Sequence, residues 1–294
     1  SCKLNMKNLI KKILFITLGA FLYFAFPLII KFRKELIYVL NYHSTYPDKN
    51  NNFVKQILFF KKHFDFIDEK FLLNANKKMK FQKPKLLITF DDAHISNFNL
   101  VSILDKYKIP AIFFVPYGFV DRKKEKSLIR ENKITNEKFN IISNLDKDKE
   151  NNYKSLSMSF QNLKKLINKN YSVGAHGYSH IRLSENLTNK QLSKEIILSK
   201  KLLEKKLDTK IYSFCWTFGD QKSYSQKASN IIKKNYKLSF MTCCKPFNFN
   251  QNKFNIHRFN IENFFSVYQI AFVLSGIYEL LYTSKRNFVN NITK

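Results

Sequence analysis

The sequence predicts an α/β fold built on a parallel sheet or barrel, preceded by one N-terminal transmembrane or signal-anchor helix. Short β-rich runs alternate with segments of helical spacing, several runs end in acidic or histidine residues, and an uncharged apolar segment lies near the N-terminus. Alternating strands and helices are typical of parallel sheets, because each helix returns the chain to the edge where the next strand begins. No internal repeat interrupts this order.

The length and net charge of the chain limit the number of domains and the kinds of partner that it can have. The chain has 294 residues, 45% of them hydrophobic, which suffices for one large domain or two small ones. Its net charge of +29 indicates an anionic partner such as a membrane surface, a phosphorylated lipid or an acidic glycan, although a bias toward Lys, Asn, Ile and Phe is a strong alternative explanation. Lysine far outnumbers arginine and no nucleic-acid motif is present, so we expect no nucleic-acid partner.

The cysteines leave two alternatives open. None of Cys2, Cys215, Cys243 and Cys244 has zinc-finger spacing. Adjacent cysteines are poorly placed to bridge each other. A bridge from Cys215 to Cys243 or Cys244 in an oxidising compartment and a set of buried free thiols are both compatible with the sequence.

The N-terminal segment is expected to be a membrane anchor. Residues 13–30 carry no charge and follow Lys7, Lys11 and Lys12. Helices that span a bilayer have about 17–25 residues, so a run of this length is near the minimum. The lysines that precede it fit the basic flank of a signal sequence. Because no cleavage site follows, we favour an uncleaved anchor that comprises residues 1–34, with a cleaved signal peptide as the alternative. The remaining domain, residues 35–294, is then expected on the periplasmic or extracellular side of the membrane.

Apolar spacing predicts the elements in order. In the first part of the domain these are a β-rich run over 35–43, a helix over 50–64, a brief strand at 66–67, a strand over 86–90, a helix over 97–107 and a strand over 110–115. After a polar insertion at about 121–155, they are a helix over 160–169, a strand over 171–176, a helix over 187–207, a strand over 211–216, a helix over 226–234 and a strand over 238–242.

The C-terminal stretch over about 264–282 is apolar. It is interpreted as a core helix packed on the barrel or, alternatively, as an interfacial helix that lies on the membrane. A second membrane span is disfavoured because Gln269 and Glu279 interrupt it.

Two adjacent carboxylates, Asp91 and Asp92, follow the strand over 86–90 directly. Two carboxylates in one pocket repel each other, so a metal on one and a hydrogen bond or proton on the other is the usual arrangement. A solvated turn after a strand is the alternative, since Asp is common in turns.

A histidine pair lies at the end of another predicted strand. His176 and His180 are four residues apart, a spacing that can bring both imidazoles to one metal ion. Such a pair is often only surface, but in α/β barrels the carboxyl ends of the strands share one mouth, where the aspartates also lie. Two histidines and one carboxylate with open positions for water make a hydrolytic metal site.

These motifs resemble the polysaccharide deacetylases of the NodB-homology type, carbohydrate esterase family 4. The resemblance covers about residues 37–260 and rests on Thr89-Phe90-Asp91-Asp92, then on His176 and His180. It implies a distorted (β/α)7-type barrel in which Asp91 is the general base and Asp92, His176 and His180 bind a divalent metal. Two histidines and one aspartate suit zinc best, with cobalt, nickel and iron as alternatives.

The sequence departs from the family pattern at several positions. Ala93 stands where Gly is usual, His94 where an aromatic residue is common, and the third motif reads Trp216-Thr217-Phe218-Gly219, with Thr in place of Pro. The resemblance implies that this segment lines the substrate groove, and Arg258 looks like a structural arginine of one branch, the extracellular poly-β-1,6-N-acetylglucosamine deacetylases. We therefore expect substrate contacts from Trp216, Phe218, Gly219 and Arg258.

The general acid has two candidates. In the same branch the acid histidine follows a tyrosine at the end of the first strand, a position that Tyr42-His43 matches. His257, in Ile256-His257-Arg258, is the alternative, and we favour His43.

The resemblance implies metal-dependent removal of N-acetyl groups from N-acetylated amino sugars. The expected partners are a membrane and an N-acetylglucosamine-type glycan of the cell envelope, an exported polysaccharide or a lipid-linked amino sugar. The alternatives are a carbohydrate O-deacetylase and a non-catalytic, membrane-anchored glycan-binding module.

Overall fold

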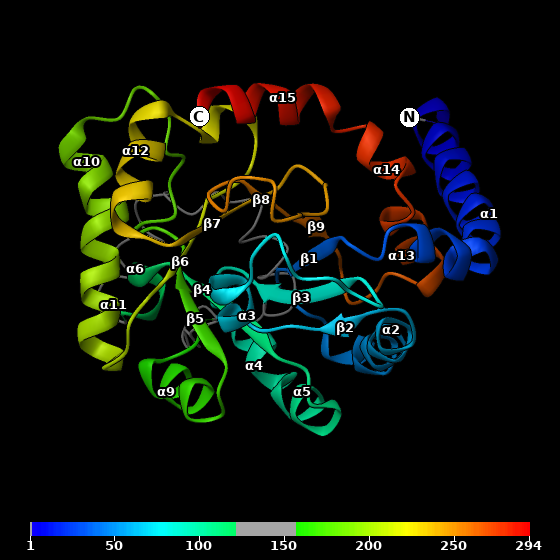
Figure 1. The fold of residues 1–294 in the computed structure, drawn as a ribbon, viewed down its shortest axis with the longest axis horizontal. Helices are drawn as coiled ribbons and strands as arrows, with labels where there is room; N and C mark the ends of the chain where they lie inside the picture. Colours follow the sequence, from blue (N-terminus) through cyan, green and yellow to red (C-terminus); the bar gives the residue numbers. More distant parts are fainter. Residues whose placement is uncertain (1, 122–156) are drawn as a thin grey trace.

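A parallel sheet, curved into a nearly closed barrel, forms the centre of the computed structural model, which describes residues 2–121 and 157–294, with side chains from residue 17 onward (Figure 1). The strand order is β8-β7-β6-β5-β4-β3-β1-β9, with β2 beside β3, and every neighbouring pair is parallel. The strands are β1 Ile37–Tyr42, β2 Asp65–Phe66, β3 Lys85–Phe90, β4 Ala111–Val115, β5 Ser172–Ala175, β6 Ser213–Cys215, β7 Leu238–Met241, β8 Ile256–His257 and β9 Phe259–Asn260. The α/β barrel expected from the sequence is confirmed.

A single residue joins the two edges of this sheet. β8 pairs with β7 at one edge, β9 pairs with β1 at the other, and Arg258 alone separates β8 from β9. The Arg258 amide donates to the Met241 carbonyl at 2.8 Å, and three residues later the Ile261 amide donates to the Asn41 carbonyl at 3.0 Å. The chain therefore closes the barrel at Arg258, and this residue is held at the centre of the molecule.

Helices surround the sheet (Figure 1). The described helices are α1 Cys2–Phe32, α2 Asn50–His63, α3 Glu69–Asn74, α4 Ile95–Asn99, α5 Val101–Tyr107, α6 Tyr117–Val120, α9 Phe160–Asn168, α10 Asn189–Ser193, the π-helical turn η2 Lys194–Leu198, α11 Ser199–Leu207, α12 Gln226–Asn235, α13 Val267–Leu274, α14 Ile277–Leu280 and α15 Thr283–Ile292. Capping explains several starts: the side chains of Ser159 and Thr188 accept from the backbone amides of Asn162 and Gln191, respectively.

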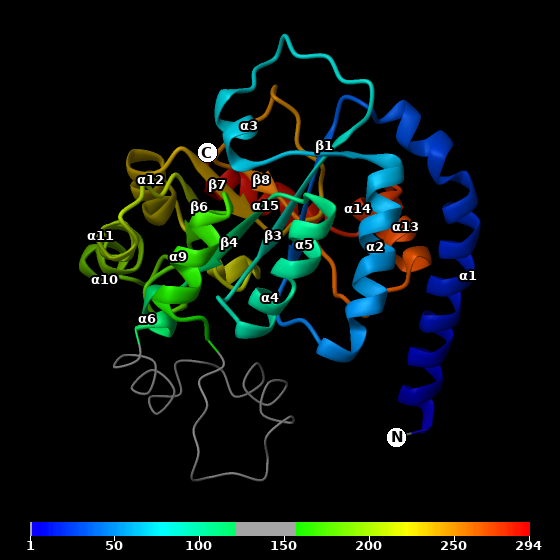
Figure 2. The ribbon, with the colours of Figure 1, turned by 90° about the horizontal axis from the view of Figure 1, so that it is seen from below.

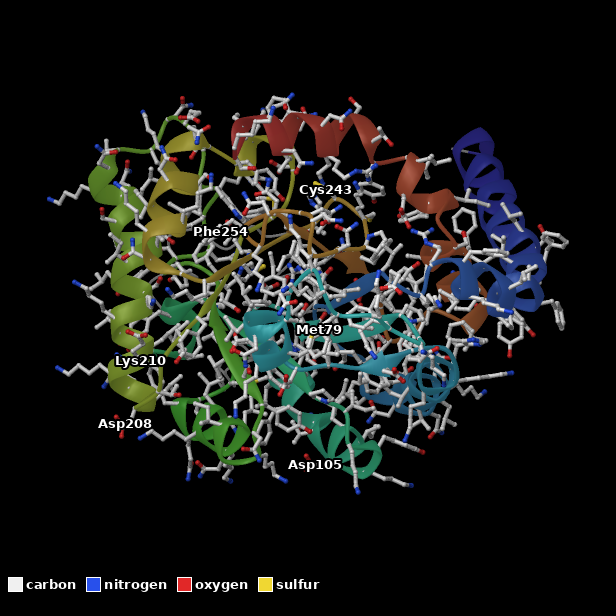
Figure 3. The ribbon with its side chains drawn as sticks, in the orientation of Figure 1. Met79, Asp105, Asp208, Lys210, Cys243 and Phe254 are labelled. Carbon is white, nitrogen blue, oxygen red and sulfur yellow. The ribbon has the colours of Figure 1, made fainter. Side chains whose placement is uncertain are left out.

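The core has two layers, because both faces of the strands are covered. Along β1, Ile37 and Val39 belong to the apolar cluster on one face, whereas Tyr38 and Leu40 belong to the cluster on the other. Buried parallel strands need apolar residues on both faces, which explains the nearly continuous apolar runs in the sequence. Charged residues such as Asp105, Asp208 and Lys210 stand at the periphery, whereas Cys243 lies inside (Figure 3).

The N-terminal helix packs on the barrel. Leu22, Phe26 and Ile30 of α1 are buried, and the Phe26 ring lies 5.0 Å from the ring of Phe59 on α2. Gly19 allows close contact with α13, since a Cβ at this position would lie 2.5 Å from the Tyr268 carbonyl oxygen. Within the described part of the chain, no helix combines the length and the apolar character that crossing a bilayer requires. The structure thus gives no support to the expected membrane span.

Other differences from the sequence expectations are local. The stretch over 264–282 forms two helices, α13 and α14, because Ser275 ends α13 and Gly276 turns the chain with φ 107°. The insertion expected at about 121–155 lies outside the described residues apart from its first position. Cys215, Cys243 and Cys244 are buried free thiols, so the Cys215 bridge is not formed.

Candidate active site

The predicted site residues meet where the strands end, at the mouth of the barrel. His43 follows β1, Asp91 and Asp92 follow β3, His176 and His180 follow β5, and the segment 216–219 follows β6. These strands are neighbours in the sheet, in the order β1, β3, β4, β5, β6. Parallel strands bring residues far apart in sequence to one edge, and this accounts for the assembly of the site.

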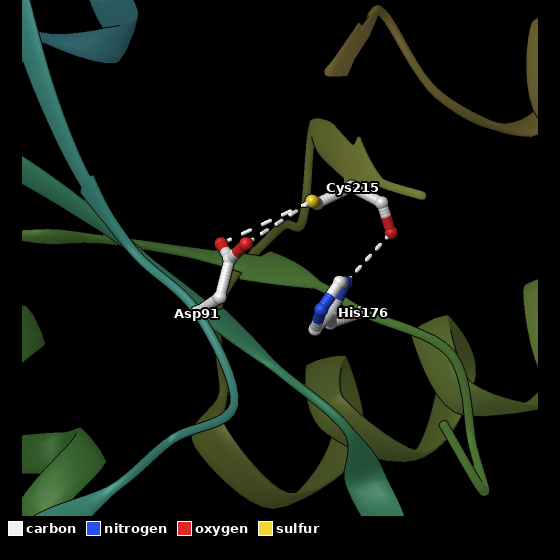
Figure 4. A group of neighbouring side chains, drawn as sticks. All are labelled: Asp91, His176 and Cys215. Carbon is white, nitrogen blue, oxygen red and sulfur yellow. Dashed lines mark hydrogen bonds between the residues drawn. The ribbon is translucent and has the colours of Figure 1, made fainter. Parts of the chain in front are cut away.

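Asp92, His176 and His180 point toward one another. The Asp92 Oδ1 atom lies 3.4 Å from His176 Nε2 and 3.0 Å from His180 Nε2. Asp92 and His180 both have positive φ, 67° and 56°, so the chain turns sharply after each strand to aim these side chains inward. The His176 Nδ1 atom lies 2.8 Å from the Cys215 carbonyl oxygen, which orients the ring with Nε2 toward Asp92 (Figure 4).

This donor set fits a divalent metal ion. One ligand atom from each of Asp92, His176 and His180 lies within 4.8 Å of the other two. Two imidazole nitrogens and one carboxylate oxygen, with room for water, are typical of hydrolytic metal sites. The contact between His176 and a backbone carbonyl is the kind of outer interaction that orients metal-binding histidines.

Asp91 is buried and held by an arginine. Its two carboxylate oxygens accept from Nη1 and Nη2 of Arg258, each at 2.7 Å. Burial raises the pKa of Asp91, but the charge of Arg258 outweighs this effect and lowers the pKa to about 2. The carboxylate is therefore ionised at neutral pH.

The two histidines considered for the general acid lie in different surroundings. His43 is partly exposed, with Nε2 3.9 Å from Asp91 Oδ2 and Nδ1 3.8 Å from a carboxylate oxygen of Glu262. His257 is buried, and its Nε2 atom lies 3.0 Å from Asn290 on α15. Side chains alternate along a strand, so Arg258 faces the site and His257 faces away from it. Of the two, only His43 lies at the mouth.

Cys215 contributes to the site in a way that the sequence did not reveal. Its Sγ atom lies 3.9 Å from both Asp91 oxygens, and Arg258 Nη2 donates to this sulfur at 2.8 Å (Figure 4). Asp91, His176 and Cys215 form a second group of close ligand atoms. The sequence left Cys215 as either a disulfide partner or a buried free thiol, and no local spacing signals its contact with Asp91.

The third motif, residues 216–219, lies partly in the core and partly beside the site. Trp216 is buried and its Nε1 donates to Ser239 Oγ at 2.9 Å. The Phe218 ring lies tilted at 41° to the ring of His180, with the ring centres 4.8 Å apart, and the guanidinium carbon of Arg182 lies 4.1 Å from the centre of the Phe218 ring. The structure therefore places Phe218 beside a ligand histidine and Trp216 in the core.

Gly219 and Arg258 are the other two residues for which the sequence predicts substrate contacts. Gly219 has φ 91°, a conformation that side chains disfavour, and follows Phe218 at the turn. Arg258 is fully buried, with its guanidinium directed at Asp91 and Thr89. This placement favours a role in positioning Asp91 and gives no support to direct substrate contact by Arg258.

Comparison with known proteins identifies the family of the chain. A family model described as polysaccharide deacetylase matches residues 78–236, just over half of the chain. The chain therefore belongs to the polysaccharide deacetylase family and is a carbohydrate deacetylase. No curated protein matches it significantly.

Solved structures share the fold. The deacetylase PplD of Streptococcus pyogenes, in complex with acetate, is 18% identical with a TM-score of 0.62, covering 82% of this chain and 99% of that one. A putative polysaccharide deacetylase of Bacillus anthracis is 20% identical with a TM-score of 0.61, covering 82% and 69%. The BpsB deacetylase domain of Bordetella bronchiseptica is 11% identical with a TM-score of 0.57, covering 78% and 96%.

Proposed function

We propose that this deacetylase is a divalent-metal-dependent hydrolase that removes N-acetyl groups from N-acetylated amino sugars. The observation that carries the proposal is the position of the buried, ionised Asp91 beside three convergent donors, Asp92, His176 and His180, with His43 nearby. The substrate class is an N-acetylglucosamine-type glycan of the envelope, an exported polysaccharide or a lipid-linked amino sugar. The Tyr42-His43 pair supports a place near the poly-β-1,6-N-acetylglucosamine deacetylases.

Asp92 Oδ1, His176 Nε2 and His180 Nε2 would hold the metal. A bound divalent ion polarises the acetamide carbonyl and lowers the pKa of water at the site. Zinc suits two histidines and one aspartate, and cobalt, nickel and iron are alternatives.

Two side chains carry out the proton transfers of the proposed reaction, Asp91 as the base and His43 as the acid. Asp91 accepts the proton of the attacking water, and Arg258 keeps its carboxylate ionised and fixed in direction. His43 donates a proton to the leaving amine, and its Nδ1 atom lies 3.8 Å from a carboxylate oxygen of Glu262. The products are acetate and a free amino sugar.

The test is acetate release by the purified full chain from β-1,4- and β-1,6-linked N-acetylglucosamine oligomers, before and after chelation and zinc addition. We expect release that a chelator abolishes and zinc restores, with one free amine for each acetate. The Asp91→Asn variant should bind metal but lose at least 100-fold in kcat, a typical loss for a general base. The matched control is Asp105→Asn, at an exposed carboxylate paired with Lys169.

The outcomes separate the alternatives. Acetate release without new amine would identify an O-deacetylase, in which the leaving alcohol depends less on His43. Full activity in Asp91→Asn would refute the proposed mechanism. Metal binding without turnover on any acetylated sugar would favour a glycan-binding module.

We also propose that the protein works at a membrane, with its catalytic domain on the periplasmic or extracellular side. The support is the uncharged segment 13–30 behind three lysines. A reporter enzyme that is active only outside the cytoplasm, fused after Lys294, should be active. Activity of a cytoplasm-specific reporter at the same position would contradict this location.

A further inference from the structure

Large apolar side chains stand exposed on α1 and around α14, two segments that Arg33 connects. We call them together the seating surface, which consists of side chains from α1, α14 and the residue that follows α14: Leu18, Phe21, Phe24, Leu28, Phe32, Ile277, Leu280 and Leu281. Phe24 is 77% exposed, Phe32 82% and Leu281 73%, values that are unusual for clustered apolar residues. Such a concentration of exposed phenylalanine and leucine marks an interaction surface.

The surface follows from the part of α1 over residues 13–30, which carries no charge on any side. Phe21, Phe24, Leu28 and Phe32 follow one another at spacings of three and four, so they share one face of α1. The opposite face, which includes Phe26, packs against the barrel. A helix that is apolar all round needs cover on every side, and the barrel supplies only half of it.

Arg33 joins α14 to this helix. Its Nη1 donates to the Ser275 carbonyl at 3.1 Å, and its Nη2 pairs with Glu279 at 2.5 Å. Glu279 lies on α14, next to Leu280 and Leu281. The apolar residues of α1 and α14 are therefore held in one rigid arrangement.

A basic rim borders the seating surface. Lys31 and Lys34 are exposed at the end of α1. On α2, the Phe59 ring stacks on Tyr23 of α1, with the ring centres 5.7 Å apart. The exposed Lys55 and Lys62 lie four residues before and three residues after Phe59, so they share its side of the helix. Exposed Glu35 is an acidic residue among these lysines. Apolar side chains bordered by lysines match an anionic lipid surface, whereas two copies of a chain with net charge +29 would repel each other there.

The direction of α1 relates this surface to the active site. A short turn over residues 33–36 connects α1 to β1, so the helix runs opposite to the strand. β1 ends at the mouth, before His43, and the N-terminal end of α1 extends toward and beyond that same side (Figure 2). A membrane that contacts the length of α1 therefore runs alongside the barrel axis.

We propose that the seating surface embeds in the interfacial layer of an anionic lipid bilayer, with the described part of α1 lying along the membrane plane. The mouth of the barrel then opens sideways at the level of the headgroups. This arrangement goes beyond an N-terminal anchor, because it requires α14 to contact lipid as well. It favours acetylated sugars held at the membrane surface.

The test measures membrane depth at single positions. Phe24→Trp, Leu281→Trp and Leu198→Trp variants of the full chain are reconstituted into vesicles of three parts phosphatidylcholine to one part phosphatidylglycerol, with and without brominated acyl chains. Trp216 is buried and provides the background signal. Leu198, 40% exposed beside α11, is the matched control on the opposite side of the barrel (Figure 1).

We expect brominated lipid to quench the added signal at positions 24 and 281 by at least one third and to leave position 198 unchanged. Lys55→Gln with Lys62→Gln should weaken the quenching at position 281 in anionic vesicles. Quenching at position 24 without quenching at 281 would overturn the proposal in favour of an end-on anchor. Absence of quenching together with cross-linking between copies through position 281 would overturn it in favour of a dimer.

This readout is independent of turnover. Leu280→Ser with Leu281→Ser should leave acetate release from soluble oligomers within twofold of the wild type, since both residues lie outside the site. Loss of membrane contact with intact activity would reject only the seating surface. Absence of acetate release from the wild type as well as from the variants, with normal lipid quenching, would instead reject the proposed function.

Discussion

At the scale of single residues, the site depends on one arginine that the barrel closure brings to Asp91. Arg258 donates to both oxygens of that carboxylate, to Thr89 and to the sulfur of Cys215. Burying a carboxylate costs several kcal/mol unless a partner compensates for its charge. Asp91 can therefore remain ionised inside the barrel only because Arg258 is there.

Replacing Arg258 by Gln tests whether the ionised state of Asp91 depends on this arginine. The lost charge should raise the pKa of Asp91 from about 2, shift the acidic limb of the pH–activity profile upward and destabilise the fold by about 3–5 kcal/mol. Arg258→Lys, which keeps the charge but not the paired hydrogen bonds, should be intermediate in both respects. Urea unfolding and pH profiles of kcat/KM measure the two effects, and an unshifted acidic limb in the Gln variant would contradict the assigned role.

Cys215 offers a second test at this scale. A Cys215→Asp substitution would place a second carboxylate within reach of Asp91, so like-charge repulsion should raise the pKa of Asp91 and reduce activity at least tenfold. Cys215→Ser, close in size and neutral, should stay within about threefold. Rates of acetate release measured at pH 6 and pH 8 test whether a raised pKa of Asp91 is the cause. If it is, the Cys215→Asp variant should recover activity at the higher pH.

His257 should contribute a pH dependence to folding. Burial lowers its pKa to about 4, below the value of about 6.5 expected in the unfolded chain. Because the unfolded state then binds more protons, the stability contribution is full above about pH 6.5 and is lost as the pH falls toward 4. The full effect is on the order of 3 kcal/mol. Thermal unfolding between pH 4.5 and 7.5 should show a steeper loss in the wild type than in His257→Gln.

At the scale of elements, close packing between strands limits side-chain size. Gly174 lies in β5 beside Phe114 of β4, and an added Cβ would lie 2.4 Å from the Phe114 ring. The ring is fully buried and has no room to move away. The two strands therefore require glycine at this position, a requirement set by the neighbour rather than by any turn.

Gly174→Ala should consequently destabilise the protein by about 1–3 kcal/mol, the usual cost of overpacking. Equilibrium unfolding in urea measures the change, and Lys164→Ala, at an exposed position of α9, serves as the control. Equal stability of the two variants would show that Phe114 can shift.

At the scale of the whole molecule, the proposed metal ligands come from two strands of the barrel. Asp92 follows β3, and His176 and His180 follow β5. A metal that binds only the folded chain stabilises it by mass action, by about 2.7 kcal/mol at one hundred times its dissociation constant. For a domain of this size, that corresponds to a rise of about 5–10 °C in Tm.

We therefore expect chelation to lower the Tm and zinc to restore it. His180→Gln should reduce the shift to less than half, whereas Asp105→Asn, on the exposed surface, should leave it unchanged. Differential scanning calorimetry with and without zinc makes the comparison. An equal shift in the His180 variant would show that the metal binds elsewhere.

The sequence by itself determined the alternation of strands and helices and the residues that carry chemistry. Apolar runs such as those in β1 and β3 are long enough to identify buried strands, and the acidic and histidine residues that end them are visible without a structure. The TFDD motif and the spaced histidines were sufficient to identify the family. These signals are local, because hydrophobic periodicity and motif spacing depend only on neighbours in the chain.

Tertiary structure alone decided which distant residues complete the site. Arg258 reaches Asp91 because β8 and β9 close the barrel around it, and Cys215 at the end of β6 reaches both because the curved sheet brings its side chain toward Asp91 after β3, although β4 and β5 lie between the two strands. The same holds for α1 and α14, two segments far apart in the sequence that Arg33 connects. Contacts between residues more than a hundred positions apart arise from strand order and helix packing, and no local pattern in the chain encodes them.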